Sequence, residues 1–379
     1  MIEHGRPKWL ASAVVAVALC AVVGACGDDD EQPSNGGSGA EVQIMPDDPE
    51  YTKYQELPLE EKLRTELPCD TNPSPEEQVA YKVPKAKSEY KIALMEVTLA
   101  GYYYQAIAAG ARKAADEAGV DLRIVSSGEG YADPATQIRQ ADDVAQRGVD
   151  AVVLAPSDIQ GSIPIVRKFV NDDKPVINIS TEVATAEAYM VMQDDYIMGK
   201  LSADEVARQV GEAGGPGIII GGPANATWSR KRVAGFQDQV KEKYPQLEIV
   251  AAPTQNVDPA LGLQSFENAA QGASDVKWVY TVFDALLQPK SLPQNYRDIT
   301  LVSNGFDPVS AGDLESGRIS ALIGISPTAM GYMGVGSAVS VLNGEELPAL
   351  QCVPIPTITK DNMNDEVAQA ELIPKGYEE

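Results

Sequence analysis

Three consecutive tyrosines, Tyr102 to Tyr104, stand directly before an alanine-rich segment that favours a helix. A tyrosine ring offers a flat apolar face, and its hydroxyl offers a hydrogen bond. The run therefore allows two interpretations: packing inside a core, or a stacking surface for a flat, polar small molecule. Which one holds depends on where the neighbouring elements place these side chains.

Catalytic residues of the common kinds are missing from most of the chain. Its one histidine, His4, lies in the N-terminal segment. The rest of the chain thus has no Ser-His-Asp or Cys-His arrangement and lacks the commonest transition-metal ligand. It also has no Gly-x-x-x-x-Gly-Lys-Ser/Thr phosphate loop. We expect no metal, no cofactor and no enzyme, although an enzyme built only on carboxylates, Lys or Tyr stays open.

The charge of the chain excludes one class of partner. The formal net charge is −25 at pH 7. Nucleic-acid binding relies on Lys and Arg that neutralise phosphates, so we expect no nucleic-acid partner. The acidic excess is interpreted as a source of solubility.

The first 25 residues predict a secretory signal. A basic "RPKW" precedes an apolar run, Leu10 to Ala25, that is short for a membrane span of about 20 residues. Its ending, Val23 to Cys26, resembles the bacterial lipobox, in which the cysteine is lipidated and becomes the new N-terminus. Residues 26–40 then read as a flexible tether. The alternative is an uncleaved anchor helix. We expect an extracytoplasmic protein held at the bacterial cell membrane through the lipid alone.

The cysteine count predicts one disulfide. Cys20 leaves with the signal and Cys26 carries lipid, so Cys69 and Cys352 remain. In an oxidising compartment an even pair is most simply a disulfide.

Residues 41–89 form an unusual extension. The segment is rich in Pro and Glu, with one short helix expected near Leu59 to Leu67. It has too few apolar residues for a core of its own. We therefore expect it to wrap the main body, held by Cys69.

From Tyr90 onward, apolar strands alternate with amphipathic helices in two series. Residues 284–298 are expected to be mostly loop. The predicted strands cover residues 90–97, 120–127, 149–156, 174–180, 188–193, 215–222, 247–253, 276–283, 299–306, 318–325 and 349–359. This alternation predicts α/β architecture: two doubly wound lobes, each a parallel sheet covered on both faces. In such sheets ligands bind beyond the C-terminal ends of the strands.

Several stretches together resemble the type I periplasmic binding proteins of ribose and related sugar ABC importers. The resemblance runs from about Tyr90 to Leu350 and leaves the extension outside. It is carried by "IALMEVTLAGYYYQAIAAGARKAADEAGVDL", "DPATQIRQADDVAQRGVDAVVLAPSD", "KPVINIST", "MQDDYIMGKLSADEVA", "SRKRVAGFQ", "SNGFDP" and "ISPTAMGYMGVGSAV".

The resemblance implies two lobes joined by a three-strand hinge. The chain would cross near 193/194, near 325/326 and near 353–357. Lobe 1 would then hold residues 90–193 and 326–352, and lobe 2 residues 194–325 and 353–379. Cys352 would lie by the hinge, so the disulfide is also expected to limit how far the lobes open.

The resemblance also implies a ligand site between the lobes. Tyr103 and Tyr104 match aromatics that sandwich the sugar, whereas Tyr102 is expected to pack under the hinge. Arg232 would donate to ligand hydroxyls or a carboxylate. Asp307 would accept from hydroxyls, cap the following helix, or do both.

Five positions depart from the family pattern and become small or apolar. An Asp-Arg pair is replaced by Ser180 and Thr181, and Gly101, Phe283 and Ile325 replace polar amides. Candidates of lower weight complete the predicted site: Glu96, Thr98, Asn225, Trp228, Asn256, Val257 and Asp284. Asp194 and Asp195 are expected to be hinge residues, and Arg230 to form a structural pair.

These departures predict a ligand other than ribose. A buried hydroxyl without its partner costs about 1–3 kcal/mol. A deoxy sugar, a polyol, a larger glycoside, or an aromatic or amino-bearing solute fits better.

The sequence thus predicts a monomeric lipoprotein that captures a small sugar-like solute and delivers it to an ABC permease. A sensor of the same fold that signals to a membrane receptor or kinase is the alternative. A repressor of this fold would need a DNA-binding motif where this chain has a signal and an acidic tether.

Overall fold

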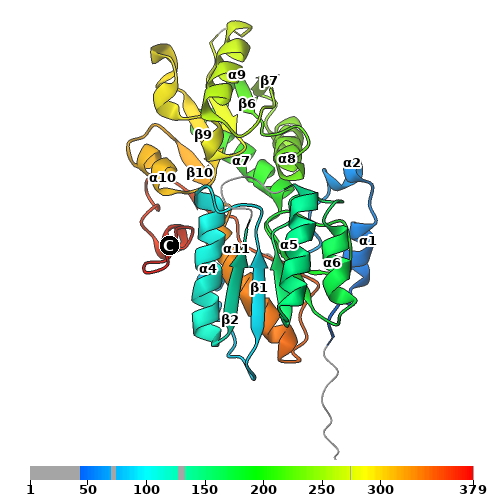
Figure 1. The fold of residues 1–379 in the computed structure, drawn as a ribbon. Coiled ribbons are helices and arrows are strands. Elements are labelled where there is room, and N and C mark those ends of the chain that lie inside the picture. Colours follow the sequence, from blue (N-terminus) through cyan, green and yellow to red (C-terminus); the bar gives the residue numbers. More distant parts are fainter. Residues whose placement is uncertain (1–42, 70–73, 127–132, 274, 379) are drawn as a thin grey trace, which may run out of the picture. The chain divides into compact units, whose positions relative to one another are not determined.

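The computed structural model describes residues 43–69, 74–126, 133–273 and 275–378. The predicted signal, the tether and Cys26 lie outside these residues. Within them, helices and strands interleave around two six-stranded sheets, shown in Figure 1. The predicted α/β class with two doubly wound lobes is confirmed.

The first sheet is fully parallel, with strand order β11-β5-β4-β3-β1-β2. Side chains alternate between its faces. Ile92 and Leu94 of β1 join the cluster formed with helices α4 and α11, while Ala93 and Met95 join the cluster formed with α5 and α6. Both faces are therefore covered by helices. The elements are β1 (Lys91–Met95), α4 (Tyr102–Ala118), β2 (Asp121–Val125), α5 (Pro134–Gln146), β3 (Ala151–Leu154), α6 (Ile163–Val170), β4 (Val176–Ile179), β5 (Tyr189–Met192), α11 (Pro327–Leu342) and β11 (Leu350–Cys352).

The second sheet has strand order β12-β10-β9-β8-β6-β7, and only the β10–β12 pair is antiparallel. One hydrophobic cluster runs through this lobe. The segment expected to be mostly loop contains only short 3₁₀ turns. The elements are α7 (Asp195–Val210), η1 (Gly211–Ala213), β6 (Gly215–Ile220), α8 (Thr227–Lys243), β7 (Leu247–Ala251), α9 (Pro259–Gln271), β8 (Trp278–Thr281), η2 (Asp284–Leu286), η3 (Pro289–Ser291), η4 (Gln294–Tyr296), β9 (Thr300–Asn304), α10 (Pro308–Glu315), β10 (Ala321–Ile323), β12 (Thr357–Ile358) and α12 (Glu366–Gln369).

Glycines let helices α7 and α8 touch backbone to backbone. A Cβ on Gly199 would lie 2.1 Å from the carbonyl oxygen of Arg232, and a Cβ on Gly235 would lie 2.0 Å from that of Tyr196. No other residue type fits at these contacts. The crossing therefore fixes where α8 presents Arg232.

The chain passes between the two sheets three times. It crosses between β5 and α7, between β10 and α11, and between β11 and β12. The last crossing corrects one expectation, because the predicted tail strand is split between the two sheets. Pro354 and Pro356 lack an N–H and so interrupt strand pairing at that point.

The extension contains more helix than expected. The short helix predicted near residues 59–67 is present as α2 (Leu59–Lys62), which covers only the start of that range. Helices α1 (Pro49–Gln55) and α3 (Pro75–Ala80) were not predicted. Asp48 caps α1 by accepting hydrogen bonds from the backbone N–H groups of Glu50 and Tyr51.

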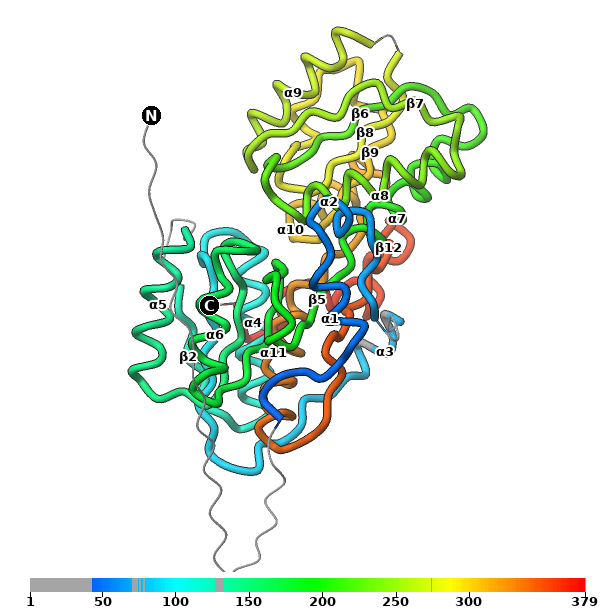
Figure 2. The backbone as a smooth tube through the Cα atoms, turned by 90° about the vertical axis from the view of Figure 1, so that its right-hand side faces the viewer, coloured from blue at the N-terminus to red at the C-terminus, as the bar shows by residue number. Residues whose placement is uncertain are grey.

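Helix α1 lies against the edge of the first sheet, near β5 in Figure 2. Tyr51, Tyr54 and Leu67 pack there with Met190 and Leu350. The extension thus has its apolar residues in a cluster shared with β5 and β11. Among the residues that the structure describes, no helix is both long enough and apolar enough to span a membrane.

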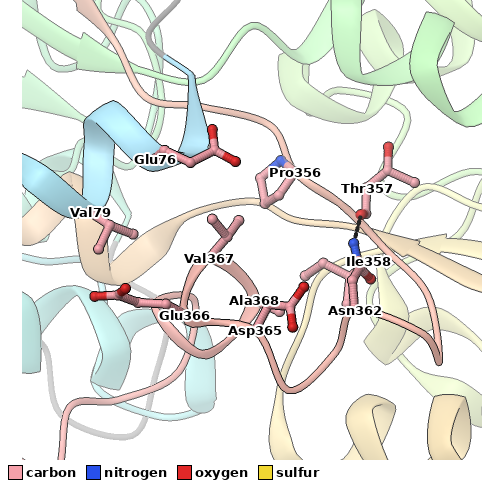
Figure 3. Close-up of a pocket in the computed structure, with 10 residues that line it drawn as sticks. All are labelled: Glu76, Val79, Pro356, Thr357, Ile358, Asn362, Asp365, Glu366, Val367 and Ala368. Carbon is pink, nitrogen blue, oxygen red and sulfur yellow. Dashed lines mark hydrogen bonds between the residues drawn. The ribbon is translucent and has the colours of Figure 1, made fainter.

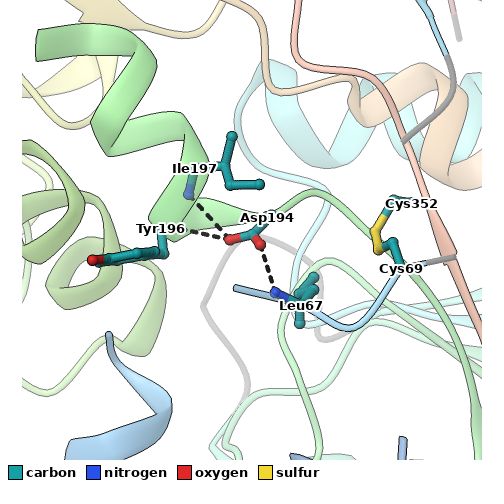
Figure 4. The surroundings of a disulfide bond; sticks show 6 residues. All are labelled: Leu67, Cys69, Asp194, Tyr196, Ile197 and Cys352. Atoms are coloured by element: carbon teal, nitrogen blue, oxygen red, sulfur yellow. Dashed lines mark hydrogen bonds between the residues drawn. A yellow bond between two sulfur atoms is a disulfide. The ribbon is translucent and has the colours of Figure 1, made fainter. Parts of the chain in front are cut away.

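The predicted disulfide is present. It joins Cys69 to Cys352 at the end of β11, with 6.1 Å between the Cα atoms and a sequence separation of 283 (Figure 4). The bond ties the extension to the edge strand of the first sheet.

Removal of this disulfide tests how much it stabilises the fold. Closing a long loop restricts the unfolded chain, so we expect Cys69→Ser with Cys352→Ser to lose about 2–5 kcal/mol of unfolding free energy. Urea unfolding followed by circular dichroism measures the loss. A reductant should destabilise the wild type and leave the double variant unchanged. Equal stability of variant and wild type would contradict a stabilising role.

Candidate functional site

Most of the predicted site residues lie where strands end. Glu96 and Thr98 follow β1, Ser180 and Thr181 follow β4, and Phe283 follows β8. The others in this group are Asp284, Asp307 and Ile325. Gly101, Tyr103 and Tyr104 stand at the start of α4, and Arg232 lies on α8.

The three tyrosines have different surroundings. Gly101 adopts φ 92° and precedes α4, a conformation that disfavours any side chain. The hydroxyl of Tyr102 accepts a hydrogen bond from the backbone N–H of Ile373 at 2.8 Å, which holds Tyr102 to the C-terminal segment. Tyr103 stands edge-on to Tyr104, with 5.1 Å between ring centroids.

Tyr103 links the lobes. Its ring is half-buried and packs against the hydrophobic clusters of both. Its hydroxyl donates to Oγ of Ser180 at 3.1 Å. Ser180 itself has φ 69°, an uncommon conformation for a residue other than glycine.

The turn that carries Ser180 and Thr181 is held by Asn178. The side-chain amide of this buried residue donates to the carbonyl oxygen of Thr181 at 2.7 Å, and its Oδ1 accepts from the N–H of Val183 at 2.8 Å. The backbone at this strand end is therefore fixed from within.

Arg232 is engaged inside its own lobe. Its Nε donates to Oδ1 of Asp195 at 2.8 Å, and its Nη1 donates to the carbonyl oxygen of Val282 at 2.8 Å. The guanidinium group lies 5.1 Å from the ring centroid of Trp228. Asp195, expected only as a hinge residue, is thus the counter-ion of Arg232. Nothing in the local sequence signals this pairing.

Two carboxyl groups stand on the same lobe. Oδ1 of Asp307 accepts from the N–H groups of Val309 and Ser310, so its capping role is present. Oδ2 of Asp284 is shielded from solvent and has no hydrogen-bond partner among the described residues. Burial first, and then the charge of Asp307, raise the pKa of Asp284 to about 7. This carboxyl group is therefore partly protonated near neutral pH.

Other predicted residues lie apart or serve as packing. Ile325 is buried in the hydrophobic cluster of the second lobe, and Phe283 stands edge-on to Trp228. Oγ1 of buried Thr98 accepts from the N–H of Ala100. Val257 is 45% exposed, and Asn225 and Asn256 are also on the surface. Arg230, near the start of α8, forms an ion pair with Glu60 of the extension at 2.7 Å.

A cavity of about 20 Å³ joins residues of both lobes and the extension. It has room for about one water molecule. Its lining includes the predicted residues Ser180, Thr181, Asp195 and Trp228, and others that sequence reasoning missed. These others are Leu67, Glu182, Met192, Gln193, Thr227 and Lys231.

A larger pocket of about 400 Å³ lies elsewhere, between α3 and the C-terminal segment (Figure 3). None of the predicted ligand residues lines it. Its residues are Glu76, Val79, Pro356, Thr357, Ile358, Asn362, Asp365, Glu366, Val367 and Ala368. Within the described parts of the chain, no three His, Cys, Asp or Glu side chains gather where they could hold a metal ion.

A family model described as a periplasmic binding protein domain matches residues 92–346. The chain belongs to this family. The resemblance recognised in the sequence is thus confirmed, and the extension before residue 92 lies outside the matched range.

Several relatives of this periplasmic binding protein are named as binding proteins. The ribose import binding protein RbsB of Escherichia coli is 27% identical over 280 residues, covering 73% of this chain and 92% of RbsB. A xylitol-binding protein of Mycolicibacterium smegmatis is 25% identical over 249 residues, covering 61% and 67%. A solved carbohydrate transporter solute binding protein from Agrobacterium radiobacter, in complex with D-arabinose, aligns with a TM-score of 0.68 and 24% identity, covering 76% of this chain and 100% of that one.

One carboxyl group of this periplasmic binding protein is fully enclosed. Glu96 is 0% exposed, and neither of its carboxylate oxygens has a hydrogen-bond partner among the described residues. Burial raises the pKa of Glu96 to about 9, while the charge of Arg112 lowers it by less. The group is therefore protonated at neutral pH and can donate one hydrogen bond.

Glu96→Gln tests this protonation. At pH values between the ordinary pKa of 4.5 and the folded pKa of about 9, this carboxyl group is ionised in the unfolded chain and protonated in the folded one, so folding takes up a proton. The contribution of the Glu96 carboxyl group to the unfolding free energy is therefore complete below pH 4.5. It decreases as the pH rises above 4.5 and is lost as the pH rises through 9. From pH 4.5 to pH 7, we expect Glu96→Gln to gain about 3 kcal/mol of unfolding free energy relative to the wild type.

Urea unfolding across this pH range is the measurement. The matched control is Glu248→Gln, at an exposed position, which should show no comparable trend. A constant difference between Glu96→Gln and the wild type would contradict the protonated state.

Proposed function

We propose that this chain is an extracytoplasmic solute-binding protein that captures a small sugar-like ligand between its lobes and delivers it to the permease of an ABC importer. The observation that carries the proposal is the position of Tyr103, which packs against both lobes and donates to Ser180. A solute held between the lobes would meet an aromatic face there. The ribose and xylitol named for two relatives support this role.

Binding requires no chemical step. A ligand that contacts both lobes has higher affinity for the closed arrangement, and this difference drives closure. The closed form then docks on the permease. The protein is accordingly proposed to be a binding protein, not an enzyme, and to need no cofactor.

The proposed ligand is less polar than a fully hydroxylated pentose. Asp195 and Val282 already take hydrogen bonds from Arg232, which leaves fewer donors for ligand hydroxyls. Phe283 and Ile325, which pack in the second lobe, offer no hydrogen bond where the resembled family has amides. A deoxy sugar, a polyol or an amino-bearing solute fits such a site, and the ring faces of Tyr103 and Tyr104 would contact its C–H groups.

The proposed location follows from the N-terminal sequence. Lipid on Cys26 would hold the protein at the outer side of the bacterial cell membrane, and residues 26–40 would let it reach the permease. We propose that it works as a monomer.

A solute panel tests the function. Bound ligand raises the unfolding midpoint by mass action, so at least one of D-ribose, D-arabinose, D-allose, xylitol and D-glucosamine should raise it. We expect D-ribose to give the weakest binding. Micromolar binding of D-ribose by calorimetry would contradict the inferred ligand class, and the absence of any shift across the panel would count against the function.

Tyr103 variants test the site. We expect Tyr103→Ala to weaken binding of the best panel member about tenfold, because it removes an aromatic contact of about 1–1.5 kcal/mol. Tyr103→Phe keeps the ring, loses the hydrogen bond from the hydroxyl to Ser180 and serves as the matched control. Titration calorimetry on folded variants measures both. Unchanged affinity in Tyr103→Ala would remove the tyrosine from the site.

A further inference from the structure

The extension is attached firmly to the first lobe. The buried hydroxyl of Tyr51 donates to the carbonyl oxygen of Ala188 at 2.9 Å. Tyr54 and Leu67 pack in the same cluster, and Cys69 is covalently bound to Cys352. Residues 48–69, here called the strap, are therefore fixed to this lobe by apolar and covalent contacts.

The strap contacts the second lobe through charged side chains. Three of its side chains form ion pairs with helices α7 and α8: Glu60 with Arg230 at 2.7 Å, Glu66 with Lys200 at 2.8 Å, and Arg64 with Asp238. These pairs are largely exposed. Exposed pairs are individually weak and are screened by salt. The contacts to the two lobes thus differ in kind.

A buried junction lies beneath these surface pairs. Glu182, in the loop after β4, accepts from Nζ of Lys62 at 2.7 Å and from the hydroxyl of Tyr54 at 3.2 Å. Lys231 of α8 donates to the Tyr54 hydroxyl at 2.6 Å, and its Nζ lies 3.6 Å from Glu182. These charged groups are at most 5% exposed. The junction thus contains one charged side chain from the first lobe, one from the second lobe and one from the strap.

The strap also contacts a crossing directly. The N–H of Leu67 donates to Oδ2 of Asp194 at 2.6 Å, while Oδ1 of Asp194 accepts from the first N–H groups of α7 (Figure 4). Asp194 stands between β5 and α7, where the chain enters the second lobe. Leu67 lines the small cavity beside it.

We propose that the strap is an additional part of the hinge, beside the three crossings, which latches the second lobe onto the first and so sets which inter-lobe arrangements are populated. A buried charge group held by partners from three segments is satisfied in one arrangement only, since separating the lobes would take Lys231 away from Glu182 and Tyr54. The inference deepens the proposed function, because affinity scales with the fraction of molecules in the binding-competent arrangement.

Inter-lobe distances in the ligand-free protein test the strap. Spin labels at Gln146→Cys on α5 and Glu267→Cys on α9, attached without reductant, report the distribution by pulsed electron resonance. We expect Glu60→Gln, Arg64→Gln and Glu66→Gln together to shift the ratio of latched to unlatched molecules about tenfold. About 1 M NaCl should shift the wild type in the same direction.

The controls separate the strap from general charge effects. Lys168→Gln breaks an ion pair with Asp142 inside the first lobe and should leave the distribution unchanged. Lys231→Met removes the charge that the second lobe contributes to the junction, and this variant should broaden the inter-lobe distance distribution most. An unchanged distribution in the triple variant and in Lys231→Met would overturn the inference. These distances need no ligand, so that result is distinct from a solute panel without a binder.

Discussion

Both lobes depend on three crossing segments that are hydrogen-bonded to one another. The N–H of Val353 donates to the carbonyl oxygen of Met192 at 2.9 Å, which joins the third crossing to the first. The N–H of Gly324 donates to the carbonyl oxygen of Pro356 at 2.8 Å, which joins the third to the second. Because each crossing completes a sheet at one end and starts the other lobe at its other end, a rotation between the lobes must be absorbed by all three together.

Buried carboxylates fix two of these crossings. Asp194 serves the first, since it caps α7 and accepts from Leu67. Glu371 serves the second, since its two oxygens accept from the N–H and the hydroxyl of Ser326 at 2.7 and 2.6 Å. Burial raises the pKa of Glu371 to about 7, so this attachment carries a proton-sensitive group. The hinge is therefore tied by long-range side-chain contacts as well as by its backbone.

The sequence predicts whatever depends on local pattern. Alternating apolar runs and cap residues such as Asp133 and Asp307 locate the strands and helices, because strand period and helix capping are short-range properties. The counting of cysteines located the disulfide. The helices of the extension were not predicted well, since they are short and their apolar residues, such as Tyr51 and Tyr54, are buried only by tertiary contacts with β5 and β11. The strand pattern alone gave one tail strand over residues 349–359, and its division between the two sheets, which depends on tertiary pairing, was implied only by the family resemblance.

In the candidate site too, local sequence predicts the type of a residue, while tertiary contacts decide what that residue can do. Sequence comparison could name Arg232 as a donor, but its strength toward a ligand depends on Asp195, thirty-seven positions away, which already holds it at 2.8 Å. The charge that a ligand would meet between the lobes is thus what remains after these internal ion pairs have formed, not the sum over all charged side chains. Since Lys231 is likewise held by Glu182 and Tyr54, cations near the cavity are neutralised from within. In the proposed function, recognition by the aromatic faces of Tyr103 and Tyr104 would then outweigh recognition by charge.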